Sequence, residues 1–174
     1  VVAANAAGTR EGVEHLIGRG HRRIAFIGDA VQIWTAHERL LGYREALRAH
    51  EIPIDDDIVR VGVHDAATAE QAARELLSHG QPPTAIFTGN NLLTVGVYRA
   101  LRTHDRPIAL VGFDDFELAA LLDPPITTVG QDATAMGRTA AELLFARRTD
   151  PTRKPRTVTL PTTLIVRGSD EVRG

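Results

Sequence analysis

The sequence predicts an α/β fold with doubly wound parallel sheets, and two observations support that prediction. Short segments rich in Val, Ile and Phe alternate with amphipathic segments of helical periodicity along the 174 residues. Parallel strands that helices cover on both faces are almost continuously apolar, and each strand–helix–strand unit implies a right-handed crossover. A chain of this length is expected to form one large domain or two small lobes.

The four most apolar runs are predicted to be strands of a parallel sheet that are covered on both faces. They lie at residues 23–28, 58–63, 84–89 and 108–113. The opening VVAAN has the composition of a buried strand already under way, so we expect an N-terminally incomplete fragment. A last long strand is predicted within RTVTLPTTLIVRG, at residues 156–168.

Helices are predicted between these strands. Apolar residues recur at helical spacing between residues 36 and 47, and again between residues 69 and 77. The segment at 92–101 is apolar nearly all round, which predicts a helix that buries two faces. A further helix is predicted at 133–148, before a basic loop that contains proline.

Composition excludes several kinds of function. The formal net charge of −2 and the pI near 6.4 give the chain as a whole no attraction to nucleic acid or anionic membranes. The absence of cysteine excludes disulfides, thiolate metal sites and cysteine nucleophiles. No apolar run approaches the roughly 18 residues of a membrane span, and no signal peptide opens the chain, so we expect a cytoplasmic protein.

Motifs for catalysis, cofactors and metals are missing from the sequence. There is no G-x-x-x-x-G-K-[ST] loop, and Gly18 and Gly20 form only a fragment of a dinucleotide motif. Ser78 and Ser169 are the only serines, and neither lies in a nucleophile-elbow pattern. The seven histidines lack metal-ligand spacing. We therefore predict that the chain is no enzyme and uses neither cofactor nor metal.

Residues that directly follow the predicted strands are the candidates for a ligand site, because open α/β sheets bind ligands beyond the carboxyl ends of their strands. Asp114 and Asn90 follow two of the strands, and their side chains can accept hydrogen bonds from ligand hydroxyls. Arg39, near the start of a predicted helix, carries a planar guanidinium that can bridge two hydroxyls or hold a carboxylate. The aromatic candidates, which core or rim positions explain equally well, are Trp34, His64 and Phe116.

Two of these assignments have an alternative. Asp114 and Asp115 are adjacent, and either could cap the helical turn that follows. We assign Asp114 to the ligand and Asp115 to the cap, because strand-end residues line such sites. One of Asn90 and Asn91 is likewise expected to cap the next helix and the other to contact the ligand, and we assign Asn90 to the ligand.

Six motifs follow one another along the chain: NAAGTREGVEHLIGRGHRRIAFIGD, TAHERLLGYREAL, PPTAIFTGNNLLTVGVYRAL, IALVGFDDFELAALLDPPITTVGQD, MGRTAAELL and TLPTTLIVRGSDE. In this order and spacing they resemble the effector-binding region of the lactose/galactose (LacI/GalR) repressor family of bacterial transcription regulators. The resemblance covers essentially the whole chain. It implies a periplasmic-binding-protein-like fold of two lobes, with the effector held in the cleft between them.

The resemblance also implies roles for particular residues. Arg39 corresponds to the effector-clamping arginine, Asp114 to the cleft aspartate and Asn90 to a polar strand-end contact, while Gln131 lies at a crossover between lobes. His64 stands where the family often has a larger stacking aromatic. Ala4 precedes Asn5 where members usually have Asp-Asn, so one carboxylate is missing from the rim. The effector is therefore expected to differ from an ordinary hexose.

The lobes are expected to divide the chain unequally. Residues 1–28 and 131–160 are predicted to form a partial N-terminal lobe, and residues 29–130 and 161–174 the C-terminal lobe. The chain would cross between lobes near residues 29–35, 130–132 and 161. The helix-turn-helix headpiece that binds operator DNA in this family is expected to be absent.

These observations favour the effector-sensing core of a LacI-type DNA-binding transcriptional regulator, a repressor. It would bind a small polar molecule of the sugar type and transmit closure of the cleft to DNA-binding headpieces, the only part expected to contact operator DNA. The alternatives are a solute-binding protein of a transport system and an enzyme on a flavodoxin-like sheet, for which catalytic groups are missing.

A homodimer is also expected, because apolar residues follow the aspartates and occupy the helix at 92–101. No membrane partner is predicted. The predicted dimer interface consists of Leu93, Val97, Tyr98, Leu118, Leu121 and Leu122.

Overall fold

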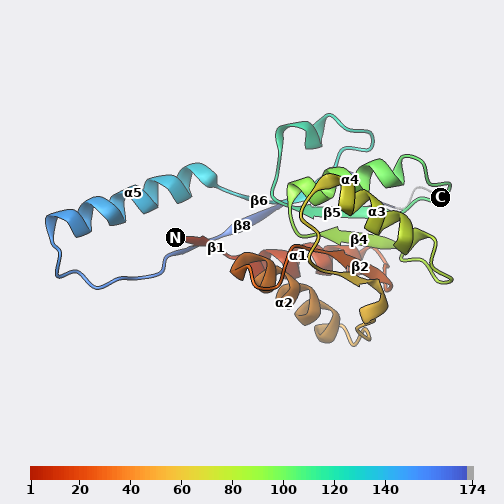
Figure 1. Cartoon of the computed structure of the whole chain (residues 1–174), viewed down its shortest axis with the longest axis horizontal. Helices are drawn as coiled ribbons and strands as arrows, with labels where there is room; N and C mark the ends of the chain where they lie inside the picture. The colour runs from red at the N-terminus through yellow and green to blue at the C-terminus, as the bar shows by residue number, and fades with distance from the viewer. Residues whose placement is uncertain (172–174) are drawn as a thin grey trace.

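A six-stranded sheet organises most of the protein, as Figure 1 shows for the computed structural model, which describes residues 1–171. The order across the sheet is β3-β2-β4-β5-β6-β8. These strands are β2 (Ile24–Ile27), β3 (Val59–Arg60), β4 (Ala85–Thr88), β5 (Ala109–Phe113), β6 (Thr127–Gln131) and β8 (Thr162–Ile165). Neighbours are parallel except for β6 and β8. The predicted α/β fold with a parallel sheet is confirmed, with one antiparallel edge strand.

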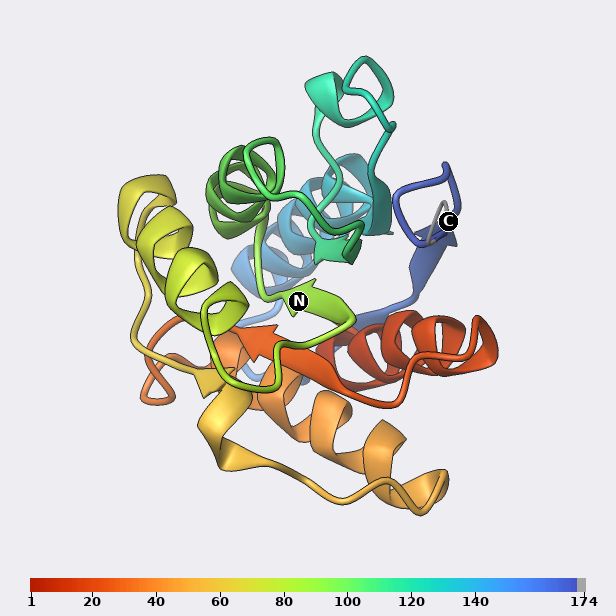
Figure 2. The same cartoon turned by 90° about the vertical axis from the view of Figure 1, so that its right-hand side faces the viewer.

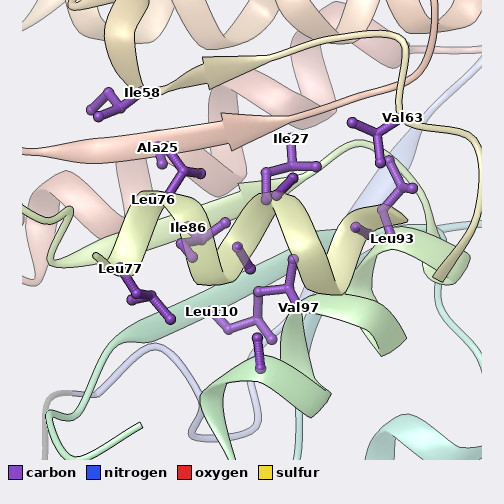
Figure 3. Close-up of a cluster of buried hydrophobic side chains, with 14 of the residues drawn as sticks. Ala25, Ile27, Ile58, Val63, Leu76, Leu77, Ile86, Leu93, Val97 and Leu110 are labelled. Atoms are coloured by element: carbon purple, nitrogen blue, oxygen red, sulfur yellow. The ribbon is translucent and has the colours of Figure 1, made fainter. Parts of the chain in front are cut away.

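Two pairs of helices cover the two faces of this sheet (Figure 2). The pairs are α1 (Asn5–Gly18) with α2 (Trp34–Ala49), and α3 (Ala66–Leu77) with α4 (Asn91–Leu101). Side chains alternate between the faces along each strand. Phe26 and Phe87 therefore pack with α1 and α2, whereas Ile27 and Ile86 belong to the cluster beneath α3 and α4 that Figure 3 shows. Both faces of β2, β4 and β5 are thus buried, as their apolar runs predict. The run at 58–63 differs, because β3 lies at the edge of the sheet and is only partly buried.

Three elements extend away from the sheet at one end of the molecule (Figure 1). β1 (Val2–Ala3) pairs in parallel with β7 (Thr159–Leu160), and α5 (Ala133–Thr149) leads outward from the end of β6. No residue of α5 is buried, and the side chains of Leu144 and Phe145 are exposed. The described residues therefore leave this helix without a packing partner.

Pro161 divides the last strand, which the sequence predicts as one segment. β7 ends at residue 160 and β8 begins at residue 162, and the two strands belong to different sheets. Proline has no backbone N–H to donate to a strand ladder, so a sheet is commonly interrupted where it occurs. The chain re-enters the six-stranded sheet at this residue, one of the three predicted crossing points.

The expected boundary at residues 28 and 29 differs from the structure. β2 is hydrogen-bonded between β3 and β4, and Val13, Leu16 and Ile17 of α1 are buried in the same cluster as strands of the main sheet. Residues 5–28 therefore pack with the body that residues 29–130 form. The chain joins this body near residue 4, because the apolar face of α1 covers strands that follow it in the chain. Residues 172–174 of the predicted C-terminal lobe lie outside the described residues.

Helix α4 buries two faces, as its apolar sequence predicts, but this burial removes part of the predicted dimer interface. Leu93 and Val97 are completely buried in the cluster between α3, α4 and the sheet. Tyr98 is half-buried, and its hydroxyl donates to the carbonyl oxygen of Asp123 at 3.1 Å. The exposed leucine of this helix is Leu92. Assigning Leu93 and Val97 to a surface was wrong, because the face they share is the one that meets α3.

Asp170 fastens the end of the described chain to the sheet. Its buried carboxylate accepts a hydrogen bond from the Thr127 hydroxyl, and its Oδ2 atom lies 2.7 Å from His15 Nε2 and 3.3 Å from Arg19 Nη2. Burial acts to raise the pKa of Asp170, but the hydrogen bonds from Thr127 and His15 outweigh burial and leave the pKa below its ordinary value. The ionised carboxylate therefore stabilises the folded protein.

We expect Asp170→Asn to lower the free energy of unfolding at pH 7 by about 1–3 kcal/mol, because a charged, buried acceptor is lost. A carboxyl group with a lowered folded-state pKa stabilises the fold above its unfolded-state pKa of about 3.9 and ceases to do so as pH falls through the folded-state value. The difference between variant and wild type should therefore shrink below pH 4. Urea unfolding at several pH values measures it, with the exposed Asp105→Asn as the control. A pH-independent difference would contradict this account.

Candidate functional site

Polar side chains gather where the parallel strands end, at the edge of the sheet from which α5 extends (Figure 1). β4 is followed by Asn90, β5 by Asp114, and β6 ends on Gln131. Because β2 to β6 are all parallel, their carboxyl ends meet at one edge, where open α/β sheets bind ligands. The site predicted from the strand ends thus has a single location in the fold.

Arg39 lies at the centre of this edge. It belongs to the second turn of α2 and is 7% exposed, and its Nε atom donates to Asn5 Oδ1 at 2.8 Å. Its Nη1 atom donates to the Gly89 carbonyl oxygen at 2.5 Å and to Asp114 Oδ2 at 3.0 Å. The guanidinium also lies over the Phe113 ring, 3.9 Å from its centroid. A planar cation held on three sides in this way presents its remaining edge in one orientation.

Asp114 and Gln131 complete the network. Asp114 accepts from Arg39 through both carboxylate oxygens, and its Oδ1 atom also accepts from Gln131 Nε2 at 2.7 Å. The backbone of Asp114 has a φ of +68°, a left-handed conformation that aspartate tolerates better than most residues. The backbone N–H of Asp114 donates to the Val129 carbonyl oxygen at 2.9 Å. These contacts turn its carboxylate from the end of β5 toward Arg39 and Gln131.

The surroundings of Arg39 shift the pKa of its guanidinium without removing its charge. Burial lowers the pKa of the Arg39 guanidinium, and the neighbouring Asp114 carboxylate partly restores it. Arginine nevertheless remains protonated at neutral pH. The edge therefore offers a fixed cation beside a carboxylate and an amide, a combination that can donate to and accept from adjacent hydroxyls.

Asn5 is a member of this network that the sequence analysis did not select as a site residue. It is buried at the start of α1, donates through Nδ2 to the Ala3 carbonyl oxygen and accepts from Arg39. The sequence did contain a signal for Asn5: Ala4-Asn5 stands where family members usually have Asp-Asn, so the aspartate is replaced but the asparagine is kept. Its distance of 34 residues from Arg39 hides the contact from any local pattern.

The assignment of Asp115 as a helix cap was wrong. The 3₁₀ turn η2 (Glu117–Ala120) has Phe116 at its N-cap position, with no side-chain cap. Asp115 instead accepts from Thr128 Oγ1 at 2.7 Å and from Arg167 through both oxygens, at 2.8 and 2.9 Å. Burial acts to raise the pKa of Asp115, but the hydrogen bonds from Arg167 and Thr128 leave it lowered. Asp115 therefore ties the segment after β8 to β6, whereas Asp114 faces Arg39 and Gln131.

Asn90, assigned to the ligand, is the residue that caps α4. Its Oδ1 atom accepts from the Leu93 backbone N–H at 3.0 Å, as in an N-cap. Only its side-chain amide nitrogen therefore remains to donate to a ligand. Asn91, the alternative ligand contact, is the first residue of the helix.

The aromatic candidates lie less close to this network. Trp34 is exposed at the start of α2, and Phe116 packs partly against the cluster beneath α3 and α4. His64 is also exposed, and its Nδ1 atom lies 2.5 Å from Asp29 Oδ1. Among the predicted site residues, the structure brings Arg39, Asp114 and Gln131 into direct contact. It gives Trp34, His64 and Phe116 no contact with these three among the hydrogen bonds and ion pairs of the described residues.

Three cavities of the described residues lie elsewhere. One of about 520 Å³ lies beside α2 and β2, one of about 340 Å³ lies near the C-terminal segment, and one of about 540 Å³ lies beside α5. None of these three is lined by Arg39, Asp114 or Gln131. The site is thus an open edge of the sheet. The described residues contain no group of three or more His, Asp or Glu side chains that could hold a metal ion. None of their helices has the length and hydropathy of a membrane span.

Comparisons with known proteins agree with this architecture. Residues 13–169 match the periplasmic binding protein-like domain family. The ribose operon repressor of Escherichia coli (strain K12) is 38% identical over 160 residues, which are 90% of this chain and 48% of the repressor. The chain therefore spans about half the length of this curated relative.

Solved structures show the same similarity. A transcriptional regulator CelR–cellobiose complex is 37% identical, with a TM-score of 0.89 over 96% of this chain and 52% of that one. The lac repressor dimer bound to operator and the anti-inducer ONPF is 29% identical, with a TM-score of 0.87 over 97% of this chain and 52% of that one. Together with the sheet order and the family match, these similarities show that the chain belongs to the periplasmic binding protein-like domain family, in the form found as the effector-binding core of LacI-type transcription regulators.

Proposed function

We propose that the protein senses a small, hydroxyl-rich effector of the sugar class at the edge formed by Arg39, Asp114 and Gln131, and that effector binding controls DNA binding by the complete regulator. The observation that carries this proposal is the buried Arg39, which Asn5, Gly89 and Asp114 hold beside an open sheet edge. Relatives described as a ribose operon repressor and as a cellobiose complex support the ligand class.

A second lobe is part of the proposal. We infer that β1, β7, α5 and the loop after α5 belong to this lobe, because they lie beyond the carboxyl edge of the main sheet. Within the described residues β1 pairs with β7 in a separate sheet, and no residue of α5 is buried. An effector held between the lobes would contact Arg39 and Asp114 from one side. It would shift the population toward a closed arrangement only if it binds that arrangement more tightly than the open one.

Calorimetric titration with pentoses, hexoses and disaccharides, ribose and cellobiose among them, tests the proposal. We expect at least one sugar to bind with a dissociation constant in the micromolar to millimolar range, without being converted to a product. Turnover of the bound sugar would instead favour an enzyme. Failure of every polyhydroxylated ligand to bind would contradict the proposed ligand class. The solute-binding alternative has no support among the relatives described above, which are named as regulators.

We also propose that two copies associate through the segment after Asp115. Leu118 and Leu121 are 58% and 75% exposed, and Leu122 is half-buried against the cluster beneath α3 and α4. The hydrogen bond from Tyr98 to Asp123 holds this segment beside α4. Apolar surfaces of this kind commonly mark a partner site, and the related lac repressor is described as a dimer.

Leu121→Glu is expected to convert the dimer into a soluble monomer with unchanged effector affinity, because a charge would be buried at the interface. Sedimentation at micromolar concentration measures the change. The matched control is Leu144→Glu, at a similarly exposed leucine on α5, which should leave the dimer intact. A monomeric wild type, or dissociation by Leu144→Glu alone, would contradict this placement of the interface.

A further inference from the structure

The charges of the protein are distributed unevenly. Five of the 20 lysines and arginines lie between residues 147 and 156, a stretch with one of the 22 acidic residues. The other 164 residues then hold 15 cations against 21 carboxylates. The small net charge of the chain therefore conceals a basic segment and a mainly acidic remainder. This basic segment consists of Arg147, Arg148, Arg153, Lys154 and Arg156.

The basic segment lies at one extreme of the molecule. Arg147 and Arg148 occupy the last turn of α5, and the loop at 150–158 follows, at the end of the longest axis opposite the C-terminus (Figure 1). The loop from residue 153 to residue 158 has no regular secondary structure, and residues 147–157 are exposed. The basic segment thus lies at the end of the molecule that is far from most of the main sheet.

The cations of this segment are not neutralised by the protein. Elsewhere in the described residues, arginines such as Arg39, Arg74 and Arg167 form ion pairs with carboxylates. None of the five cations of the basic segment does so within the described residues. The one nearby carboxylate, Asp150, accepts instead from the backbone and hydroxyl of Thr152. The five charges therefore remain available to an anionic partner.

A groove beside α5 gathers most of these charges. It has a volume of about 540 Å³ and is lined by Leu143, Leu144 and Pro155 together with four of the five cations. Exposed guanidinium groups bind phosphate oxygens in a bidentate manner, and an ammonium group binds them as a point charge. The loop carries no aromatic residue, and Phe145 on α5 is a single exposed ring beside Arg148. The basic segment and its loop therefore offer no row of rings for successive unpaired bases, which argues against a single-stranded nucleic acid.

We propose that the basic segment contacts the phosphate backbone of duplex DNA without reading its sequence. The choice of DNA rests on the proposed function, in which this protein acts beside an operator. Attraction at this end and repulsion by the acidic remainder would orient the molecule with the basic segment toward the duplex. The segment then adds an affinity that is independent of sequence and sensitive to salt, beyond the contacts of a dedicated DNA-binding headpiece.

The 174-residue chain and a fluorescent 20-base-pair duplex of arbitrary sequence provide the test, by anisotropy at 20 to 200 mM NaCl. We expect weak binding at low salt that disappears at high salt. The variant Arg153→Gln, Lys154→Gln, Arg156→Gln should bind at least tenfold more weakly at the lowest salt. The plot of the logarithm of the association constant against the logarithm of the salt concentration should also become less steep, by about 0.9 for each phosphate that the variant no longer neutralises.

The matched control removes the same charge elsewhere. Arg99, Arg102 and Arg106 are exposed, and they form no ion pair within the described residues. Changing all three to Gln should leave DNA binding within about twofold of the wild type. Equal losses in both triple variants would show that only net charge matters and would overturn the proposal. Absence of wild-type binding at 20 mM NaCl, or equally tight binding of a polyglutamate of similar charge, would also overturn it.

Effector titration of the same variants separates this inference from the proposed function. The basic segment contains none of the residues that contact Arg39 or Asp114, so the triple variant should bind the effector as the wild type does. Loss of DNA binding with retained effector binding is the expected result. If the triple variant binds DNA as the wild type does, the basic segment does not contact DNA, and this conclusion is independent of the effector affinity of the variant.

Discussion

Arg39→Ala is expected to weaken effector binding by about 2–4 kcal/mol, because a charged hydrogen-bond donor is lost from a largely desolvated site. The structure adds a second effect. Asn5, Gly89 and Asp114 would each lose their bond to the guanidinium, and Asp114 would keep only Gln131 as a side-chain partner. Leaving a mostly buried carboxylate without its cation should lower the free energy of unfolding by about 2–3 kcal/mol.

Two further variants separate binding from folding. Asp114→Asn keeps the shape of the side chain and an oxygen acceptor for Gln131, so it should weaken effector binding with a smaller loss of stability. Arg48→Ala removes an exposed cation from the same helix, and both quantities should stay within about 0.5 kcal/mol of the wild type. Calorimetry and urea unfolding measure the two effects. Wild-type affinity in folded Arg39→Ala and Asp114→Asn proteins would exclude this network from the effector site.

Gly42→Ala is expected to destabilise the fold by about 2–4 kcal/mol, although alanine is the better helix former. A Cβ atom at Gly42 would lie 2.2 Å from the backbone carbonyl oxygen of Ala6, so α1 and α2 would have to move apart. That movement would loosen the layer that carries both Asn5 and Arg39. The effector affinity of this variant should therefore fall together with its stability.

The control for this prediction is a glycine in an open position. A Cβ atom at Gly137 of α5 meets no other atom within 4 Å, so Gly137→Ala should gain only the helix propensity of alanine, about 1 kcal/mol locally. Thermal unfolding of both variants gives the comparison. If Gly42→Ala unfolds at the wild-type temperature, the close approach of α1 and α2 does not limit the stability of this layer.

Local patterns in the sequence predicted most elements of the fold, although not α1, β6 or the division of the last strand. The apolar runs at 23–28, 84–89 and 108–113 contain β2, β4 and β5, and the helix predicted at 133–148 is α5 to within one residue. Alternation of strands and helices predicts a parallel sheet, and a parallel sheet brings its carboxyl ends to one edge. For this reason Asp114 could be selected from the end of its strand, and Arg39 from its place near the start of a helix. Gln131 was selected only through the family resemblance.

Contacts between distant residues decided the rest. Asn5 pairs with Arg39 and Asp115 with Arg167 because helices and strands far apart in the chain are packed together, and no local period reports such a pairing. The apolar pattern of α4 shows that two of its faces are covered, but only the position of α3 determines that Leu93 points inward and Leu92 outward. Periodicity is a property of one element, and it can predict that element from sequence alone. The division at residue 28 was wrong because the partner of a buried face is chosen by packing across the whole domain, which only the tertiary structure contains.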